Sequence, residues 1–591
     1  MKNTNRLLAL LIFITGWVAC RDNSSPQTSA SQPLKQLFAN YWEERLKLFP
    51  LEATAYGDDR YNDKMPISIS ASYRDTIRSF YQKYLDQAKA IDKPLNFEDQ
   101  MSKDLFMYEM EISFEGLKYP AHLMPINQFW SFTLEFPQLG SGDGNQPFKT
   151  VKDYDDFLKR MKIFPAWADT AIANMRKGMK LGYVLPKVLA LKVIPQLRGV
   201  ITTDVTKNIF YQPILKLPEG VSPEDKKRLT AAYSYEIVNS MIPAYNKLAV
   251  FVEKEYLPSC RNTSGMAALP KGDEYYQYLI HYYTTTNLKP DSIYQLGLKE
   301  VARLKAEMIK VKDEVKFNGT LEEFFQSINT DPQFYPFTTA KEVLDSFRAI
   351  QSIEEPFLKQ LFKESPKTGF EIRQTEAYRA ASASAEYNAG SEDGKRPGIF
   401  YVPILDPKKF NIVGMETLFL HEAIPGHHYQ ISLQQENTTL PKFRRFLGYS
   451  AYAEGWALYT ETLGRKLGLY KNPYQYLGHL SDAMHRAIRL VVDAGLHTRN
   501  MSREEAIAYM RANERISEEE ATAEIERYMA IPGQALSYKI GQLTISAMKE
   551  KYQAQLGDQF NEADFHTQLL NGGNMPLEIL EKKLAHWAGT H

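Results

Sequence analysis

Residues 416–430 read Glu416-Thr-Leu-Phe-Leu-His421-Glu422-Ala-Ile-Pro425-Gly426-His427-His428-Tyr-Gln430. Three histidines and a glutamate fall within eight residues, after an apolar Leu-Phe-Leu run and around a Pro-Gly pair. In the usual zinc motif, two histidines four residues apart share one helix face, and a glutamate follows the first of them. Here the residue four positions after His421 is Pro425. The segment therefore predicts a metal-binding helix that is interrupted at Pro425.

The Pro-Gly pair decides how a second histidine reaches the metal. Pro425 lacks the N–H that would bond to the His421 carbonyl, and its ring would crowd that carbonyl. The helix must bulge or break there, and Gly426 supplies a permissive backbone. A two-residue bulge would return His427 to the place of the second histidine. The alternative is His428, which faces the same way as His421 on an unbroken helix but lies about 10 Å along its axis. We favour His427.

Glu422 is the candidate general base. A catalytic zinc site needs three protein ligands, an open position for water and a carboxylate beside that water. Glu422 adjoins the candidate ligand His421, so it is placed to take a proton from the water. The cluster predicts a site for one zinc ion.

The third ligand is expected on a following helix, in the stretch Ser450-Ala-Tyr-Ala-Glu454-Gly-Trp-Ala-Leu-Tyr459-Thr-Glu461. Glu454 is the candidate, because the loop between the two segments lets this helix fold back antiparallel to the first. Gly455 and the neighbouring alanines would allow the two helices to pack closely. Glu461, two turns further on, is expected to hold His427 or His428 in place.

The N-terminal 33 residues are expected to lie outside the folded unit. Basic residues, a short apolar run and Val18-Ala19-Cys20 are typical of a secretory signal peptide over residues 1–19. The small residue before Cys20 resembles a bacterial lipobox, so Cys20 is the expected lipidation site and 20–33 a flexible tether. Cys260 then has no partner, which excludes a disulfide framework and cysteine ligation of a metal. We expect an exported bacterial lipoprotein, periplasmic or cell-surface, anchored to the membrane only by lipid.

Residues 34–591 are predicted to form a single, mainly α unit with two lobes. Lys+Arg and Asp+Glu both number 71, so the formal net charge is zero and no nucleic-acid partner is expected. Helix starts are marked by the capping boxes Thr320-x-x-Glu323, Ser502-x-x-Glu505 and Ser517-x-x-Glu520. The best strand candidate is Gly398 to Pro403, and the Gly/Ser/Asp-rich stretch 384–397 is expected to be a surface loop. The metal site is expected within 416–541.

The segment His421-Glu-Ala-Ile-Pro-Gly-His-His428 is similar to the hallmark of a bacterial family, domain of unknown function 885. Further family-like stretches are Glu454-Gly-Trp-Ala-Leu-Tyr, Arg486-Ala-Ile-Arg489-Leu-Val-Val-Asp493-Ala-Gly-Leu-His497 and Arg527-Tyr528-x-x-x-Pro532-Gly533-Gln534-Ala-Leu-Ser-Tyr538-Lys539-Ile-Gly541. The resemblance extends over most of the mature chain. It implies a zincin-like helical metallopeptidase fold with a deep channel. The strand predicted at Gly398 to Pro403 adds a small strand element near the metal helix. The candidate set of metal ligands is similar to that of helical metallopeptidases with a glutamate third ligand, such as thimet oligopeptidase and angiotensin-converting enzyme.

Residues after the metal motif are candidates for contacts with substrate. Tyr538 falls in the early turns of a predicted helix, where its hydroxyl would donate to the oxyanion of a tetrahedral intermediate; Tyr528 is the alternative. Asp493 and His497 are four apart on one helix face. They are expected to orient each other beside a ligand or substrate, or to form a purely structural pair.

Two further features predict how a peptide would be held. Arg486, Arg489 and Arg527 are candidates to bind a peptide carboxylate, which would favour exopeptidase action. The edge of the 398–403 strand is expected to pair with an extended peptide.

The predicted function is zinc-dependent hydrolysis of short peptides, with Glu422 activating water. One alternative is a non-enzymatic helical surface lipoprotein that binds peptides or glycans. Another is a metallohydrolase of non-peptide amides or esters, because the same activation of water serves both chemistries.

Overall fold

The computed structural model describes residues 32–376, 384–391 and 396–590. The expected signal peptide, Cys20 and nearly all of the tether lie outside these ranges. The described chain is mainly α-helical, as predicted.

Helices begin where the capping boxes predict them. Thr320, Ser502 and Ser517 each accept the N–H of the residue three positions later, and the glutamate there accepts the N–H of the cap residue. Each box satisfies two backbone donors that the first helical turn leaves unpaired. These three predicted helix starts are confirmed.

The N-terminal helices are α1 (Gln32–Leu48), α2 (Pro50–Ala55), α3 (Ala71–Lys89), α4 (Phe97–Gly116), α5 (Phe132–Gly140), α6 (Val151–Leu181), α7 (Lys187–Gly199), α8 (Gln212–Leu215), α9 (Pro223–Glu236) and α10 (Ile242–Phe251). The central helices are α11 (Gly272–Thr284), α12 (Pro290–Glu314), α13 (Leu321–Thr330) and α14 (Ala340–Leu361). The C-terminal helices are α15 (Met415–Glu422), α16 (His427–Glu436), α17 (Lys442–Phe446), α18 (Ser450–Glu461), α19 (Pro473–Thr498), α20 (Arg503–Asn513), α21 (Glu518–Ala530), α22 (Leu536–Leu556), α23 (Glu562–Leu570) and α24 (Leu577–Gly589).

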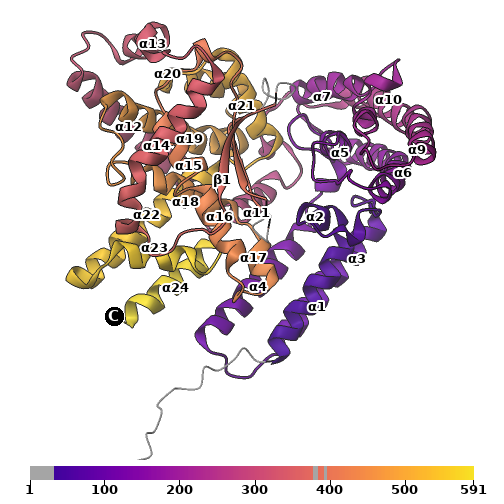
Figure 1. The fold of residues 1–591 in the computed structure, drawn as a ribbon, viewed down its shortest axis with the longest axis horizontal. Coiled ribbons are helices and arrows are strands. Elements are labelled where there is room, and N and C mark those ends of the chain that lie inside the picture. Colours follow the sequence, from indigo (N-terminus) through magenta and orange to yellow (C-terminus); the bar gives the residue numbers. More distant parts are fainter. Residues whose placement is uncertain (1–31, 377–383, 392–395, 591) are drawn as a thin grey trace, which may run out of the picture.

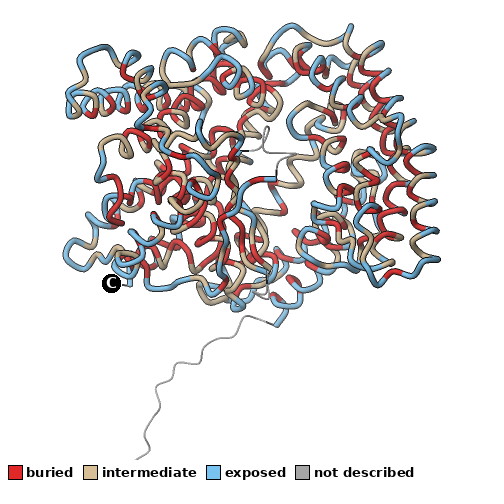
Figure 2. Tube along the Cα trace, turned by 45° about the horizontal axis from the view of Figure 1, so that its top comes forward, coloured by how far each residue is buried: buried red, intermediate tan, exposed pale blue. Residues whose placement is uncertain are grey.

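The helices form two lobes (Figure 1). Helices α5 to α10 make one lobe, at the upper right of Figure 1, around a hydrophobic core of their own that includes Phe136, Phe164 and Tyr245. The other lobe joins α1, α3 and α4 to the C-terminal helices around a second core that includes Phe106 and Trp456. Figure 2 shows buried segments within both lobes. The N-terminal helices thus pack against a part of the chain far away in sequence.

A small sheet lies beside the helices that carry the His421–His428 motif, α15 and α16. Strands β1 (Phe370–Gln374), β2 (Glu386–Asn388) and β3 (Gly398–Val402) are arranged in the order β1-β3-β2, with β1 parallel and β2 antiparallel to β3. The predicted strand is confirmed as β3. The expectation that its edge is free for a peptide is wrong, because neighbours pair with it on both sides. The prediction of a loop over 384–397 is also wrong in part, because β2 forms there.

Close helix packing brings the site segments together. A Cβ at Gly455 of α18 would lie 2.6 Å from the Cα of Gly541 in α22, so these two helices touch through their backbones. The expectation that Gly455 packs against the metal helix is therefore wrong. Instead, Thr460 and Trp456 of α18 donate hydrogen bonds to the carbonyls of Leu420 (3.0 Å) and Pro425 (2.9 Å).

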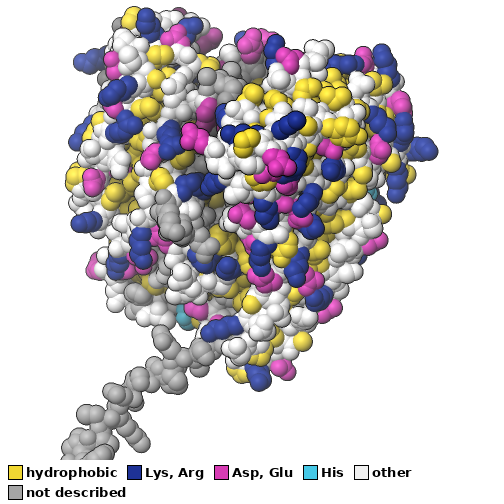
Figure 3. Space-filling view, turned by 45° about the vertical axis from the view of Figure 1, so that its right-hand side comes forward, with side chains coloured by type: hydrophobic (Ala, Val, Ile, Leu, Met, Phe, Trp, Pro, Cys, Tyr) yellow, Lys and Arg dark blue, Asp and Glu magenta, His cyan; other side chains and the backbone are white. Residues whose placement is uncertain are grey.

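The surface carries mixed charge. On the face in Figure 3, Lys and Arg side chains are interspersed with Asp and Glu, which agrees with the zero net charge. Within the described ranges, no helix combines the length and apolarity that crossing a bilayer requires.

Candidate metal centre

The metal motif spans two helices rather than one bulged helix. Helix α15 ends at Glu422 and α16 begins at His427, and the segment between them contains a cis Ile424–Pro425 peptide bond. The predicted two-residue bulge is thus a complete break. A Cβ at Gly426 would lie 1.9 Å from the carbonyl oxygen of His421, so only glycine fits where the chain turns back.

The break brings His427 to His421. One ligand atom from each of His421, His427 and Glu454 forms a group whose members lie within 4.8 Å of one another. The Glu454 Oε2 atom is 3.6 Å from Nε2 of His421 and 3.4 Å from Nε2 of His427. The two imidazole rings stand at 89° with centroids 4.8 Å apart. The structure therefore groups the three residues that the sequence proposes as metal ligands.

Glu461 orients His421 rather than His427 or His428. Its Oε1 atom lies 2.8 Å from Nδ1 of His421, and both side chains are buried. This contact leaves Nε2 of His421 facing Glu454 and fixes the ring plane. The predicted partner of Glu461 is wrong, because the hydrogen bonds between α18 and α15 place Glu461 beside α15 and not α16.

His428 points away from this group. Its Nδ1 atom lies 2.9 Å from the Tyr387 hydroxyl and 3.3 Å from Ser432 Oγ, and its ring packs on Phe370. Burial lowers the pKa of His428 to about 4, so the ring is neutral at physiological pH. The sequence leaves His427 and His428 as alternative candidates for the second ligand, and the structure places His427 beside the other two.

The pKa values of the two carboxylates at the centre are shifted in opposite directions. Burial alone would raise the pKa of Glu454, but hydrogen bonds from His421 and His427 hold it well below its ordinary value. Glu454 is therefore ionised at neutral pH, as a metal ligand must be. Burial raises the pKa of Glu422, and the nearby histidines oppose that effect. A carboxylate with a raised pKa binds a proton more readily, which suits a general base.

A cavity of about 310 Å³ opens onto this centre. Glu422 lines it together with the three candidate ligands, and its other walls include Tyr538, Arg486, Arg489 and Arg527. Its volume falls at the lower end of the 300–1,000 Å³ that is typical of small-molecule sites. The candidate base, the candidate oxyanion donor and the three arginines named from the sequence thus line one cavity.

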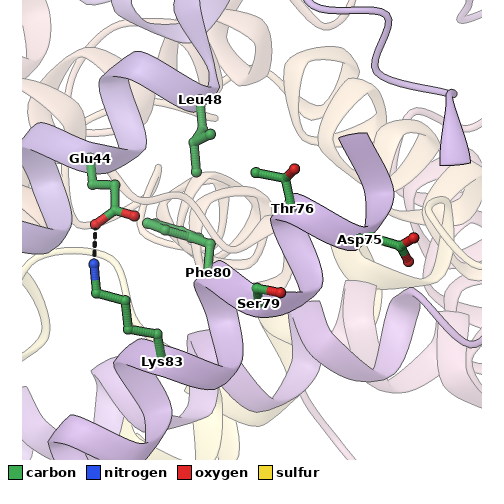
Figure 4. A pocket seen from close by; sticks show the side chains of 7 residues that line it. All are labelled: Glu44, Leu48, Asp75, Thr76, Ser79, Phe80 and Lys83. Atoms are coloured by element: carbon green, nitrogen blue, oxygen red, sulfur yellow. Dashed lines mark hydrogen bonds and ion pairs between the residues drawn. The ribbon is translucent and has the colours of Figure 1, made fainter. Parts of the chain in front are cut away.

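A second hollow, of about 430 Å³, lies between α1 and α3 (Figure 4). Lys83 donates to Glu44 across it, so these two charges are already paired. No histidine lines this hollow, and we assign it no ligand.

Tyr538 and Tyr528 occupy different surroundings. Tyr538 lies in the first turn of α22 and lines the cavity, with the Arg489 guanidinium 4.7 Å from its ring centre. Tyr528 is buried, donates to Glu524 and accepts a hydrogen bond from Arg489 Nε (3.0 Å). Of the two candidates for an oxyanion donor, only Tyr538 therefore lines the cavity, and Tyr528 supports Arg489.

Asp493 and His497 are fully buried and do not line the cavity. Asp493 accepts from the Tyr276 hydroxyl (2.5 Å) and from the Gly533 N–H (3.1 Å). His497 accepts from the Met266 N–H and faces the Tyr528 carbonyl, each at 3.1 Å. The two side chains share a helix face without orienting each other, because the neighbouring segments supply nearer partners. Their arrangement is that of structural residues.

Sequence reasoning missed two parts of the site. Glu386 and Tyr387 of β2 line the cavity, but they come from a Gly/Ser/Asp-rich stretch that carries no strand signal. His479 Nδ1 lies 3.7 Å from the second oxygen of Glu461. Its position three residues before Asp482 and seven before Arg486, on one face of α19, is a signal that could have found it.

The family is established by direct comparison. The family model described as "Bacterial protein of unknown function (DUF885)" matches residues 50–584. The chain belongs to this family. The resemblance predicted from the metal motif is thereby confirmed for the family. No curated protein matches this DUF885 chain.

Solved structures share the fold of this DUF885 protein. One is a candidate lipoprotein from Colwellia psychrerythraea, 29% identical, with a TM-score of 0.88 over 95% of this chain and 100% of that chain. Another is a candidate lipoprotein of unknown function from Shewanella oneidensis, 20% identical, with a TM-score of 0.74 over 93% of this chain and 99% of that chain. The second likeness concerns the fold alone.

Proposed function

We propose that the protein is a zinc-dependent hydrolase of short peptides with a zincin-like helical fold. The observation that carries the proposal is the group formed by His421, His427 and Glu454, which shares a cavity with Glu422. Two histidines and a carboxylate are a ligand set that catalytic zinc sites use, with one position left open. Short peptides fit the size of the cavity, and water activation suits their amide bonds.

The spacing of the donor atoms supports zinc. Zinc bonds of about 2.0–2.2 Å in tetrahedral geometry place ligand atoms about 3.4 Å apart. Glu454 Oε2 lies 3.4 and 3.6 Å from the two histidine nitrogens. Glu461 supplies the carboxylate behind a ligating histidine that such sites require. Two of the three distances between candidate ligand atoms therefore match the spacing that zinc requires.

The residues around the ion have separate tasks in hydrolysis. A bound zinc ion would act as a Lewis acid toward the scissile carbonyl and lower the pKa of water at the site. Glu422 takes a proton from the attacking water and delivers it to the leaving nitrogen. The Tyr538 hydroxyl donates to the oxygen on which negative charge develops.

We propose further that the protein is exported and carries lipid on Cys20. The support is the lipobox-like sequence that ends at Cys20 and the description of both structural relatives as candidate lipoproteins. The lipid would hold the enzyme at a bacterial membrane, in the periplasm or at the cell surface. No membrane partner beyond the lipid is proposed.

The test combines zinc content with hydrolysis of a mixed short-peptide library by wild type and Glu422→Gln. We expect one zinc per chain in both proteins, and a loss of turnover of about 10²–10⁴-fold in the variant. Retained turnover in Glu422→Gln contradicts the assignment of the base. The cleavage pattern of the wild type distinguishes exo- from endopeptidase action.

Two other outcomes would replace the proposed function. Zinc without peptide cleavage would direct the search to non-peptide amides and esters, which the same centre could hydrolyse. Purified protein without zinc would favour a binding lipoprotein for peptides or glycans.

A further inference from the structure

We propose that Arg489 and Arg527, with Arg486 beside them, form a subsite for the C-terminal carboxylate of a peptide. The inference rests on the proposed function and names its substrate class, peptides with a free C-terminus that are cleaved close to that end. The arginines come from α19 and α21 and line the same cavity as Glu422 and Tyr538.

The three arginines of the cluster are paired with only two carboxylates. Arg486 Nη1 bonds to Asp482 (3.0 Å), and the other two arginines share Glu524. Arg489 Nη2 bonds to Glu524 (3.0 Å), and Arg527 Nη1 lies 3.4 Å from the other oxygen of the same carboxylate. His485 also lies 3.5 Å from Glu524. Two guanidinium groups therefore share a single carboxylate. An incoming carboxylate would supply the missing negative charge where little water can screen it.

Each guanidinium group also has hydrogen-bonding capacity left. Within the described part of the chain, Arg486 Nε, Arg489 Nη1 and Arg527 Nε are buried nitrogens without a hydrogen-bond partner. Arg489 is buried as a whole residue, at 5% exposure. Buried unpaired N–H groups are costly, and a ligand acceptor relieves that cost. Three arginine residues that line one cavity and keep unpaired N–H groups favour a site for an anion there, in addition to their ion pairs.

Neighbouring side chains hold the cluster rigid. The Tyr528 hydroxyl accepts from Arg489 Nε, and Gln534 accepts from Arg527 Nη2 (2.9 Å). The ring of Phe129, in the connection between α4 and α5, lies 5.2 Å from the Arg527 guanidinium and is 46% exposed. A ligand at these arginines therefore lies next to an accessible aromatic ring.

The position of the cluster determines which bond is cut. Arg489 packs on Tyr538, the residue assigned to the developing oxyanion, so the carboxylate is held one or two residues from the scissile bond. The C–N bond on the N-terminal side of the held residues breaks. Water supplies the oxygen of the new carboxylate, and both of its protons end on the leaving nitrogen, which departs as an ammonium group.

The test measures binding of N-acetyl-trialanine and of its C-terminal amide to zinc-loaded Glu422→Gln protein by calorimetry. The two probes differ only in the terminal charge, and the variant does not turn them over. We expect the acid to bind about 10- to 100-fold more tightly than the amide. Adding Arg489→Gln or Arg527→Gln should reduce this preference to within about threefold, whereas Arg527→Lys should keep part of it.

Arg503→Gln is the matched control. Arg503 bonds to Glu526 (2.9 Å) and does not line the cavity, so its loss should leave the preference for the acid unchanged. Equal binding of acid and amide, or failure of both to bind, overturns the subsite. A preference that survives in both arginine variants also overturns it, because the metal would then hold the carboxylate. Since turnover is not used, the result is separate from whether wild type cleaves peptides.

Discussion

Glu461→Gln tests whether a carboxylate behind the metal ligand controls the affinity of the centre. Burial alone would raise the pKa of Glu461, but its interactions with His421 and His479 lower it to about 2, so it is ionised at neutral pH. Glutamine keeps an acceptor near Nδ1 of His421, where the present contact is 2.8 Å, but removes the charge. Such partners of a ligating histidine are worth about 10- to 100-fold in metal affinity, or about 1.4–2.8 kcal/mol.

The assay is a zinc titration against a competing fluorescent chelator at neutral pH. We expect weakening of about 10- to 100-fold in Glu461→Gln. Glu514→Gln is the matched control, because Glu514 makes a similar contact of 2.9 Å with His485 outside the centre. A change of less than about twofold in Glu461→Gln, or an equal change in the control, would refute the role given to Glu461.

Three further predictions concern the backbone, the oxyanion and a buried acid. Gly426→Ala should abolish zinc binding, measured as metal content, because its Cβ would lie 1.9 Å from the His421 carbonyl oxygen; Gly448→Ala, with open space around it, should bind zinc normally. Tyr538→Phe should lower kcat by about 10²–10³-fold with zinc content unchanged, and a loss below about threefold would argue against its role. Burial raises the pKa of Asp493 to about 7, so the native state keeps a proton that the unfolded chain releases, and stability falls as pH rises from 4 to 7. Urea unfolding of wild type against Asp493→Asn should therefore show wild type losing about 2–3 kcal/mol relative to the variant between pH 5 and 8, and a pH-independent difference would contradict the assignment.

Most of the candidate metal site could be predicted from local sequence. Pro425 and Gly426 predict an interruption of the helix, and the interruption favours His427 over His428 as the second ligand. Capping boxes fix helix starts because both partners lie within one turn. Glu454 follows from the need for an acid on the next helix. These inferences hold because the interacting groups are near one another in the chain.

Contacts between segments far apart in the chain could not be predicted from local sequence. Glu461 contacts His421 because Thr460 of α18 bonds to Leu420 of α15 and Trp456 bonds to Pro425 in the connection that follows, which sequence spacing does not reveal. Asp493 accepts a hydrogen bond from Tyr276, which lies more than two hundred residues earlier in the chain, and it does not line the cavity. Strand β2 forms only because β3 offers it an edge to pair with. In each of these examples, tertiary packing rather than local propensity determines the structure that forms.

Zinc content of purified wild type, Glu454→Ala and His428→Ala, measured by mass spectrometry after dialysis, tests the central claim most directly. The account predicts one zinc per chain in wild type and in His428→Ala, because His428 bonds to Tyr387 away from the centre. It predicts loss of zinc in Glu454→Ala, because that carboxylate lies beside both histidines. A wild type without zinc, or full occupancy in Glu454→Ala, would contradict it.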